Sequence, residues 1–403
     1  MVIKFVFFSE EYEFVKLWLA QVFSQLALNT FNFVLAIAIY ESTKSNQSVS
    51  LVVISFGLAA FLFGVAAGVI VDNLDLKNVL FVTTIARFFV VLAFLFFTGS
   101  FWGTLIVAFA LNAVSQFFFP AESAVIPSIV SKKNLLPANS LYTMSYYITQ
   151  VIGYVGAGTL IGLVGYQISI IVLAILFLLS AFFILMVKIP KKVVPDEIQL
   201  IKINKKIQKG FKDCLVYIKG NREVQRALIY LGGSQIIVGM FVSLLPGYAV
   251  EVLNIDVNKT GLYLVGPSII GMISAGFFLS VFGKDKNEEL MMKCGVFGAA
   301  VSVLLMSLSM NVFASGLTMF VVGFFNSIIV IIGNTMLQSQ TTESMRGRIY
   351  GVLQTIVTIF ALVPVVLVGY LADSVGINIV LVFVSIFILL IGLLGNKRGV
   401  QLV

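Results

Sequence analysis

The first long apolar stretch of the chain reads FVKLWLAQVFSQLALNTFNFVLAIAIY (residues 14–40), and its only charged residue is Lys16. A helix needs about 20 mostly apolar residues to cross the hydrocarbon core of a bilayer, which is about 30 Å thick. This stretch is longer than that minimum. It therefore predicts a transmembrane helix near the start of the chain.

Eleven further runs of the same kind follow along the 403 residues. They are long and continuously apolar, whereas the strands of a membrane barrel are short and alternate in polarity. The sequence therefore predicts an all-α membrane protein with twelve transmembrane helices. The predicted spans lie at 14–40, 49–71, 78–98, 101–127, 138–164, 168–188, 224–251, 260–283, 290–309, 312–338, 347–371 and 377–396.

The composition excludes a water-soluble enzyme. Hydrophobic residues make up 60% of the chain and charged residues 11%, whereas soluble domains are about 45–50% apolar and about 25% charged. Histidine is absent and only two cysteines occur, which excludes histidine-ligated metals, histidine bases and a disulfide framework. The sequence also lacks a glycine-rich phosphate loop that ends in Lys-Ser or Lys-Thr. We expect no enzyme activity, no metal and no cofactor.

Basic residues indicate the orientation of the chain. With the N-terminus inside, the predicted outward loops hold only Lys44 and Lys259, and nearly all other Lys and Arg residues lie on the inner side. This asymmetry follows the positive-inside rule. It accounts for the net charge of +8 and argues against a nucleic-acid partner. We expect a multi-pass protein surrounded by the lipid bilayer, with both termini in the cytoplasm.

The longest polar interruption lies near the midpoint and separates six predicted spans from six. It contains apolar residues at helical spacing, with lysines on the opposite face: Leu200, Ile203, Ile207, Phe211, Leu215 and Ile218. This pattern predicts an amphipathic helix on the inner leaflet, and a merely solvated linker is the alternative. We expect an N-terminal six-helix bundle at 1–190, a basic linker at 191–222 and a C-terminal six-helix bundle at 223–403.

The two halves also resemble each other. Spans 5 and 6 and spans 11 and 12 each combine a glycine-rich helix, a short outward turn and a final aliphatic helix. Two equivalent bundles related by a pseudo-twofold axis are typical of transporters that bind their substrate near the midplane. We therefore expect two pseudo-symmetric six-helix bundles with a substrate cavity formed from both.

Polar residues form a stripe along the first span. Gln21, Gln25, Asn29 and Asn32 follow one another at steps of four, four and three, so they lie on one helix face. Polar groups that face hydrocarbon are costly. The stripe therefore predicts a neutral, hydrogen-bonding cavity, and bonds that only tie helices together are the alternative. The further residues expected in this cavity are Asn112, Gln116, Tyr147, Gln150, Asn326 and Asn334.

Arg87 is the one basic residue well inside a predicted span, on the order of 15 Å from the inner boundary. An unpaired arginine at that depth costs at least about 3 kcal/mol. Asp72 and Glu122 are its candidate partners, either in a structural ion pair or as a carboxylate that titrates during transport. We prefer Glu122 as the titrating group.

Several segments resemble the major facilitator superfamily, and the similarity extends over essentially the whole chain. Residues 17–37 and 117–142 are similar to the opening helix and the span 4 to span 5 turn of its bacterial macrolide-efflux and enterobactin-exporter branch. The segment TTESMRGRIYGVLQT (341–355) resembles the family's Arg-Gly-Arg turn through Arg346 and Arg348. The segment GVIVDNLDLK (68–77) resembles a degraded gating motif that keeps Gly68, Asp72 and Lys77.

The resemblance implies the major facilitator fold, a bacterial inner (cytoplasmic) membrane location and transport by alternating access. The leading hypothesis is a monomeric secondary active antiporter that uses protons to export an amphipathic organic small molecule of the drug, macrolide or siderophore type. One alternative is a facilitator or importer of a lipid-like solute such as lysophospholipid. Another is a membrane scaffold that transports nothing.

Overall fold

A computed structural model describes residues 11–71, 74–131, 134–190, 216–282, 288–340 and 363–396. Within these ranges the regular elements are helical, and no β-strand occurs. The chain divides into two compact units. The first comprises Met1–Thr43 and Ser55–Ile198, and the second comprises Lys44–Ile54 and Gln199–Val403. The short segment Lys44–Ile54 thus packs with the later part of the chain, which the hydropathy pattern does not predict.

The helices agree with the predicted spans. In the described ranges, 9 helices are long and apolar enough to cross a membrane, and one of them, Met144–Met186, has 43 residues. That length suffices for two crossings, and its backbone breaks at Gly165, whose φ of 76° is left-handed. The shorter apolar helix Val363–Val375 overlaps the end of the eleventh predicted span, and Ile377–Leu393 lies in the twelfth. The prediction of an all-α membrane protein is confirmed.

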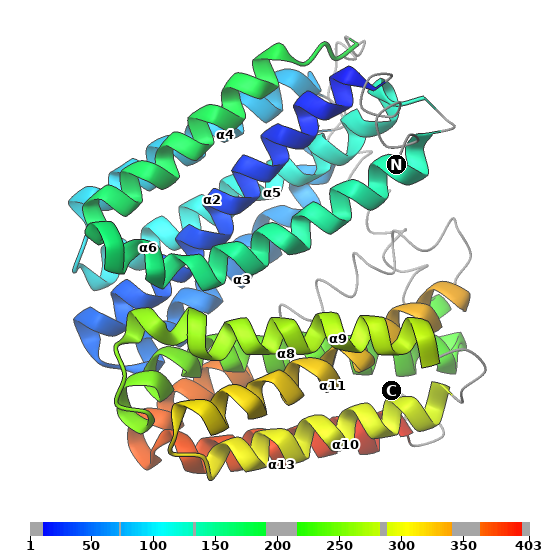
Figure 1. The fold of residues 1–403 in the computed structure, drawn as a ribbon. Helices are drawn as coiled ribbons and strands as arrows, with labels where there is room; N and C mark the ends of the chain where they lie inside the picture. The colour runs from blue at the N-terminus through cyan, green and yellow to red at the C-terminus, as the bar shows by residue number, and fades with distance from the viewer. Residues whose placement is uncertain are drawn as a thin grey trace. The chain divides into compact units, whose positions relative to one another are not determined.

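The first unit contains five helices among its described residues, and Figure 1 shows several of them running alongside one another. They are α2 (Tyr12–Thr43), the part of α3 (Asn46–Val71) from Ser55 onward, α4 (Leu76–Ala93), α5 (Phe101–Ile129) and α6 (Leu135–Met186). A 3-10 turn, η1 (Phe94–Phe96), follows α4. Asp75 and Ser100 cap the N-termini of α4 and α5, because each side chain accepts a hydrogen bond from a first-turn N–H.

Apolar side chains fill the interior of the first unit and also cover its outside. Phe14 of α2, Leu80 of α4 and Phe118 of α5 belong to one buried cluster. Phe89 of α4 is nevertheless 62% exposed, as expected for a side chain that faces lipid. Because lipid is as apolar as the core, helix packing depends on close contacts and hydrogen bonds rather than on the hydrophobic effect.

The second unit contains, besides the first residues of α3, the helices α8 (Arg222–Gly247), α9 (Gly266–Phe282), α10 (Glu288–Ser307), α11 (Val312–Ser339), Val363–Val375 and α13 (Ile377–Asn396). Glycines allow α9 and α11 to approach closely. A Cβ atom added at Gly271 would collide with the carbonyl oxygen of Phe320, and one at Gly323 would collide with that of Ser268. Small residues at such crossings are typical of membrane helices.

The chain between α8 and α9 departs from a regular α-helix. It consists of a π-helical segment η3 (Tyr248–Val252), a 3-10 turn η4 (Val257–Lys259) and a second π-helical segment η5 (Gly261–Val265). The buried Tyr248 hydroxyl lies 2.9 Å from Ser315 Oγ and 3.1 Å from the carbonyl oxygens of Met306 and Ser309. These contacts attach η3 to the α10–α11 connection.

The predicted linker at 191–222 lies outside the described residues as far as residue 215. Residues 216–220 are helical, and Ile218 is buried. The Tyr217 hydroxyl donates a hydrogen bond of 2.8 Å to the Gln340 carbonyl oxygen, so the end of this segment is attached to α11. An amphipathic helix in the rest of the linker stays a prediction.

Candidate functional site

The inner part of the α2 polar stripe connects α2 to α6. Gln21 is fully buried; its Oε1 accepts a hydrogen bond of 2.8 Å from Ser145 Oγ, and its Nε2 donates one of 3.4 Å to the Tyr142 carbonyl oxygen. Trp18 Nε1 donates to the same Ser145 hydroxyl at 3.0 Å. At this position the stripe therefore binds helices together, which is the alternative that the sequence left open.

The middle of the stripe is buried but incompletely hydrogen-bonded. Gln25 is 1% exposed and Asn29 is 7% exposed. Among the described residues, Gln25 Oε1 and Asn29 Nδ2 have no hydrogen-bond partner. Gly153 of α6 lies so close that an added Cβ would be 2.9 Å from the Asn29 Cβ. A buried polar atom without a partner costs about 1–3 kcal/mol, so these two amides are candidates for a binding role.

The outer part of the stripe is paired with α5. Asn112 Nδ2 donates hydrogen bonds of 3.1 Å to Asn32 Oδ1 and 2.9 Å to the Ala108 carbonyl oxygen. Gln116 Nε2 donates one of 3.4 Å to the Asn112 carbonyl oxygen. All three amide side chains are half-buried. The structure thus brings together amides that the sequence predicted on separate spans.

Aromatic rings accompany the polar groups of α6. Gln150 and Tyr154 hydrogen-bond through their side chains, and the Tyr154 ring stacks on Phe33 of α2 with 5.5 Å between centroids. Tyr154 belongs to the same predicted span as Gln150, whereas Phe33 was not predicted as part of the site. The side chain of Tyr147, which was predicted, lies outside the described residues.

The predicted polar residues of the second unit both lie on α11. Asn326 of α11 is buried, and its Oδ1 accepts a hydrogen bond of 2.8 Å from Ser234 Oγ of α8. Asn334 is half-buried, and its Nδ2 donates 2.9 Å to the Val330 carbonyl oxygen of its own helix. Asn326 therefore connects two helices.

Arg87 of α4 is fully buried in the first unit. Its NH1 donates a hydrogen bond of 2.9 Å to Ser24 Oγ of α2, its NH2 donates 3.1 Å to Thr84 Oγ1, and its Nε donates 3.3 Å to the Thr83 carbonyl oxygen. Ser24 lies one position before Gln25. The guanidinium is therefore attached to the same helix that carries the polar stripe.

Two aromatic faces complete the environment of the guanidinium. Its Cζ lies 4.0 Å from the Phe118 ring centroid and 5.1 Å from that of Phe177. Such contacts stabilise a desolvated cation by about 2 kcal/mol. Ring faces of this kind leave no signal in sequence spacing, because Phe118 and Phe177 are far from Arg87 along the chain and phenylalanine is abundant throughout.

Glu122 of α5 is 1% exposed, and its Oε1 has no hydrogen-bond partner among the described residues. It attracts Arg87 electrostatically. Within the described part of the chain, however, the Arg87 guanidinium is held by hydroxyls, a carbonyl and rings, and no carboxylate lies within ion-pair distance. Asp72, the other predicted partner, lies outside the described residues.

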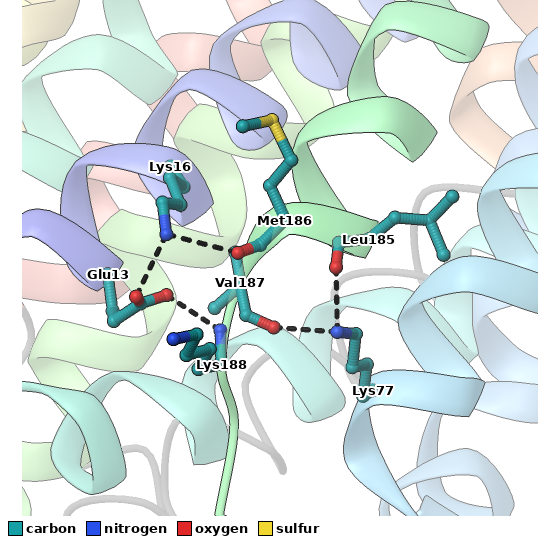
Figure 2. Close-up of polar contacts among 7 residues, drawn as sticks. All are labelled: Glu13, Lys16, Lys77, Leu185, Met186, Val187 and Lys188. Carbon is teal, nitrogen blue, oxygen red and sulfur yellow. Dashed lines mark hydrogen bonds and ion pairs between the residues drawn. The ribbon is translucent and has the colours of Figure 1, made fainter.

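Lys77, predicted in the gating motif, lies against the end of α6 (Figure 2). Its Nζ donates hydrogen bonds of 2.8 Å to the Leu185 carbonyl oxygen and 2.7 Å to that of Val187. The last carbonyls of a helix have no intrahelical donors and carry partial negative charge. Lys77 therefore caps α6. Gly68 lies in α3, while Asp72, Arg346 and Arg348 lie outside the described residues.

A second lysine reaches the same helix end. Lys16 Nζ of α2 donates 3.1 Å to the Met186 carbonyl oxygen and pairs with Glu13 at 2.8 Å. Glu13 Oε2 in turn accepts a hydrogen bond of 2.6 Å from the backbone N–H of Lys188. Figure 2 shows the two lysines approaching the terminus of α6 from different helices. The first unit is thus tied together at this end by α2, α4 and α6.

Known membrane transporters resemble this chain in sequence. The Major Facilitator Superfamily model matches residues 17–363. The uncharacterized MFS-type transporter YkuC of Bacillus subtilis (strain 168) is 30% identical over 183 residues, which are 44% of this chain and less than half, 42%, of that protein. Macrolide efflux protein A of Streptococcus pyogenes is 22% identical, with 91% of each chain covered.

A solved structure shows the same fold. It is a bacterial homolog to the human lysosomal transporter Spinster, in an inward-facing and unoccupied conformation. It matches with a TM-score of 0.77 at 12% sequence identity, and the match covers 95% of each chain. At that identity the likeness concerns the fold alone.

Proposed function

Because the chain belongs to the Major Facilitator Superfamily and is a multi-pass membrane transporter, we propose that it exports amphipathic organic small molecules by proton-coupled alternating access. The proposed solutes are of the drug, macrolide or siderophore type. The similarity to macrolide efflux protein A over 91% of both chains supports export. We also propose that the protein is a monomer in the bacterial cytoplasmic membrane, with both termini inside.

The observation that carries this proposal is the buried middle of the α2 polar stripe, in the first unit. Gln25 and Asn29 offer an acceptor and a donor that no described residue satisfies, and the aromatic rings of Phe33 and Tyr154 stack in the same unit. Binding sites for organic molecules combine apolar and aromatic walls with a few such polar groups. A solute with an apolar body and neutral polar groups matches this combination.

Glu122 is the proposed proton carrier. Its carboxyl is enclosed, its Oε1 has no hydrogen-bond partner among the described residues, and the nearby Arg87 is held by neutral groups. When Glu122 binds a proton, the positive charge of Arg87 loses its electrostatic counterpart; when the proton leaves, the attraction returns. A change of one full charge in a buried site is large compared with a hydrogen bond. In the proposed mechanism this change of charge favours one conformation over the other.

Transport should be tested with the purified chain in liposomes that carry an imposed proton gradient. We expect gradient-driven movement of a labelled macrolide or another amphipathic cation or neutral compound, and we expect an uncoupler to abolish it. If transport continues unchanged after the gradient collapses, the coupling is wrong. If expressing cells instead accumulate a labelled lysophospholipid and export none of these compounds, the exporter assignment is wrong.

The role of Glu122 needs a matched pair of variants. Glu122→Gln should lose at least about tenfold of gradient-driven export while it keeps gradient-independent exchange of labelled for unlabelled solute, because only the proton site is removed. Glu289→Gln is the control, since Glu289 is exposed and paired with Lys293 on α10. Equal gradient-driven export by the two variants would exclude Glu122 as the proton carrier.

A further inference from the structure

The first turn of α3 is held differently from the rest of that helix. Lys44, just before it, has a left-handed φ of 51°, which turns the chain from α2 into α3. Lys44–Ile54 belongs to the second unit, whereas α3 from Ser55 onward belongs to the first. A single continuous helix, Asn46–Val71, is therefore shared by both units.

One carboxylate binds the N-terminus of α3. Asp373 Oδ1 accepts hydrogen bonds from the Asn46 backbone N–H at 2.7 Å and from Asn46 Nδ2 at 3.0 Å. Its Oδ2 accepts from Ser45 Oγ at 2.5 Å and from the Gln47 N–H at 3.1 Å. The first N–H groups of a helix have no intrahelical acceptor, and a negative charge there also interacts favourably with the helix dipole. Asp373, 327 residues away from Asn46 in sequence, thus caps a distant helix.

A second carboxylate and two glycines complete this arrangement. Glu251 of the π-helical η3 accepts a hydrogen bond of 3.1 Å from Asn46 Nδ2. A Cβ added at Gly247 would collide with the Asn46 side chain, and one at Gly369 would collide with Ser50 Oγ. Asn46 and Ser50 are fully buried. The first turn of α3 therefore sits in a close-fitting seat of the second unit.

We propose that this arrangement is the latch of an outer gate. The outer latch comprises Ser45, Asn46, Gln47, Glu251 and Asp373, and by the predicted orientation its residues come from three outward turns. The inference rests on the proposed function, because alternating access requires the outward side to open during export. Opening on the outward side must therefore break the Asp373 bonds or bend α3 near Ile54, where this helix passes from the second unit into the first.

The chemistry of the outer latch suits a reversible contact. Asp373 and Glu251 are exposed, so water replaces their hydrogen bonds when α3 leaves. Exposed charged groups contribute only modestly to stability, so these bonds can break at a small cost in free energy. The buried contacts at Gly247 and Gly369 fix the position of the first turn of α3. The exposed carboxylates provide hydrogen bonds that form and break.

The test measures the reactivity of a thiol behind the outer latch. In cells, with Cys214 and Cys294 replaced by Ser, Val49→Cys introduces a smaller side chain at a position that is fully buried in the same segment of α3. A membrane-impermeant maleimide added outside should label this thiol only when the first turn of α3 leaves its seat. The labelling rate therefore reports the population in which the outer latch is open.

Asp373→Asn and Asp373→Ala should each raise this labelling rate about tenfold, since loss of a charged helix cap shifts an equilibrium by about one decade. Asp256→Asn is the matched control. Asp256 is also an exposed carboxylate on a predicted outward turn, but it caps only its own segment through the Asn258 N–H at 2.8 Å. This variant should label at the rate of the parent.

A second thiol separates gating from unfolding. Val303→Cys lies in α10 and is fully buried in the second unit, so it should stay unlabelled in every Asp373 variant. Labelling at both positions would make Asp373 a residue that only stabilises the fold, and unchanged labelling at position 49 would also overturn the outer latch.

The labelling needs neither substrate nor proton gradient. If the variants label as expected but the protein exports nothing, the outer latch is supported and the proposed function is wrong. If the protein exports but both Asp373 variants label at the rate of the parent, the proposed function is supported and the outer latch is wrong.

Discussion

Arg87→Ala is the substitution with the largest expected effect on stability. The guanidinium is fully buried, donates three hydrogen bonds and lies over two aromatic rings. Removing one member of a buried charged network costs about 3–5 kcal/mol, and the lost ring contacts are part of that cost. We expect a loss of about 4 kcal/mol in the free energy of unfolding.

A domain of this size loses about 2–4 °C in its unfolding midpoint for each kcal/mol. Arg87→Ala should therefore lower the midpoint of thermal unfolding in detergent by about 10 °C. Phe89→Ala is the matched control on the same helix, because Phe89 is 62% exposed toward lipid, and it should change the midpoint by less than about 2 °C. If Arg87→Ala behaves like this control, the buried guanidinium does not stabilise the first unit.

A double variant identifies the electrostatic part of the effect. Replacing a buried charged pair with apolar or neutral groups of similar size is often nearly neutral, whereas removing one charge alone is costly. Arg87→Met should therefore be destabilising by itself, and adding Glu122→Gln should recover at least about 1 kcal/mol of the loss. Strict additivity of the two substitutions would show that Arg87 and Glu122 do not interact.

Three further predictions concern packing and binding. Lys77→Met should cost about 1–3 kcal/mol of unfolding free energy, because two carbonyls at the end of α6 lose a charged donor. The control Lys293→Met, on the exposed face of α10, should cost less than about 0.5 kcal/mol. Equal midpoints of thermal unfolding in the two variants would show that Lys77 does not cap α6. Gly271→Ala should destabilise the second unit by at least about 2 kcal/mol, since its Cβ meets the backbone of α11, and Gly276→Ala, with open space around it, should unfold like the parent. Asn29→Leu should lower export about tenfold, roughly the value of one lost hydrogen bond, with an unchanged unfolding midpoint; full export would show that Asn29 only packs.

Much of the architecture follows from the sequence because a membrane imposes local rules. In hydrocarbon each backbone N–H and C=O must be satisfied within its own segment, so a long apolar run becomes a helix whatever its neighbours are. For this reason the predicted spans agree with the described helices, including the break at Gly165 that separates the fifth and sixth spans. The position of the polar stripe along α2 follows from the same helical periodicity.

The partners of the polar residues do not follow from the sequence. Spacing placed Gln21 and Asn32 on one face of α2, but it did not reveal that Gln21 would bond to Ser145 of α6 and Asn32 to Asn112 of α5. Of the two carboxylates expected near Arg87, Glu122 acts on it electrostatically, but the groups within contact distance include Ser24 and two ring faces that the spacing did not reveal. These partners depend on how helices rotate and pack, which hydropathy does not encode.

The sequence by itself thus determined that the protein lies in a lipid bilayer, where the chain crosses it and which helix faces carry polar groups. Each of these features depends on residues within one or two helical turns. The tertiary structure alone decided that Lys77 caps α6 and that Asp373 caps α3. Both contacts join residues more than a hundred positions apart. A lysine or an aspartate at a helix end has the same local pattern whichever helix it reaches, so only the packing of whole helices selects its partner.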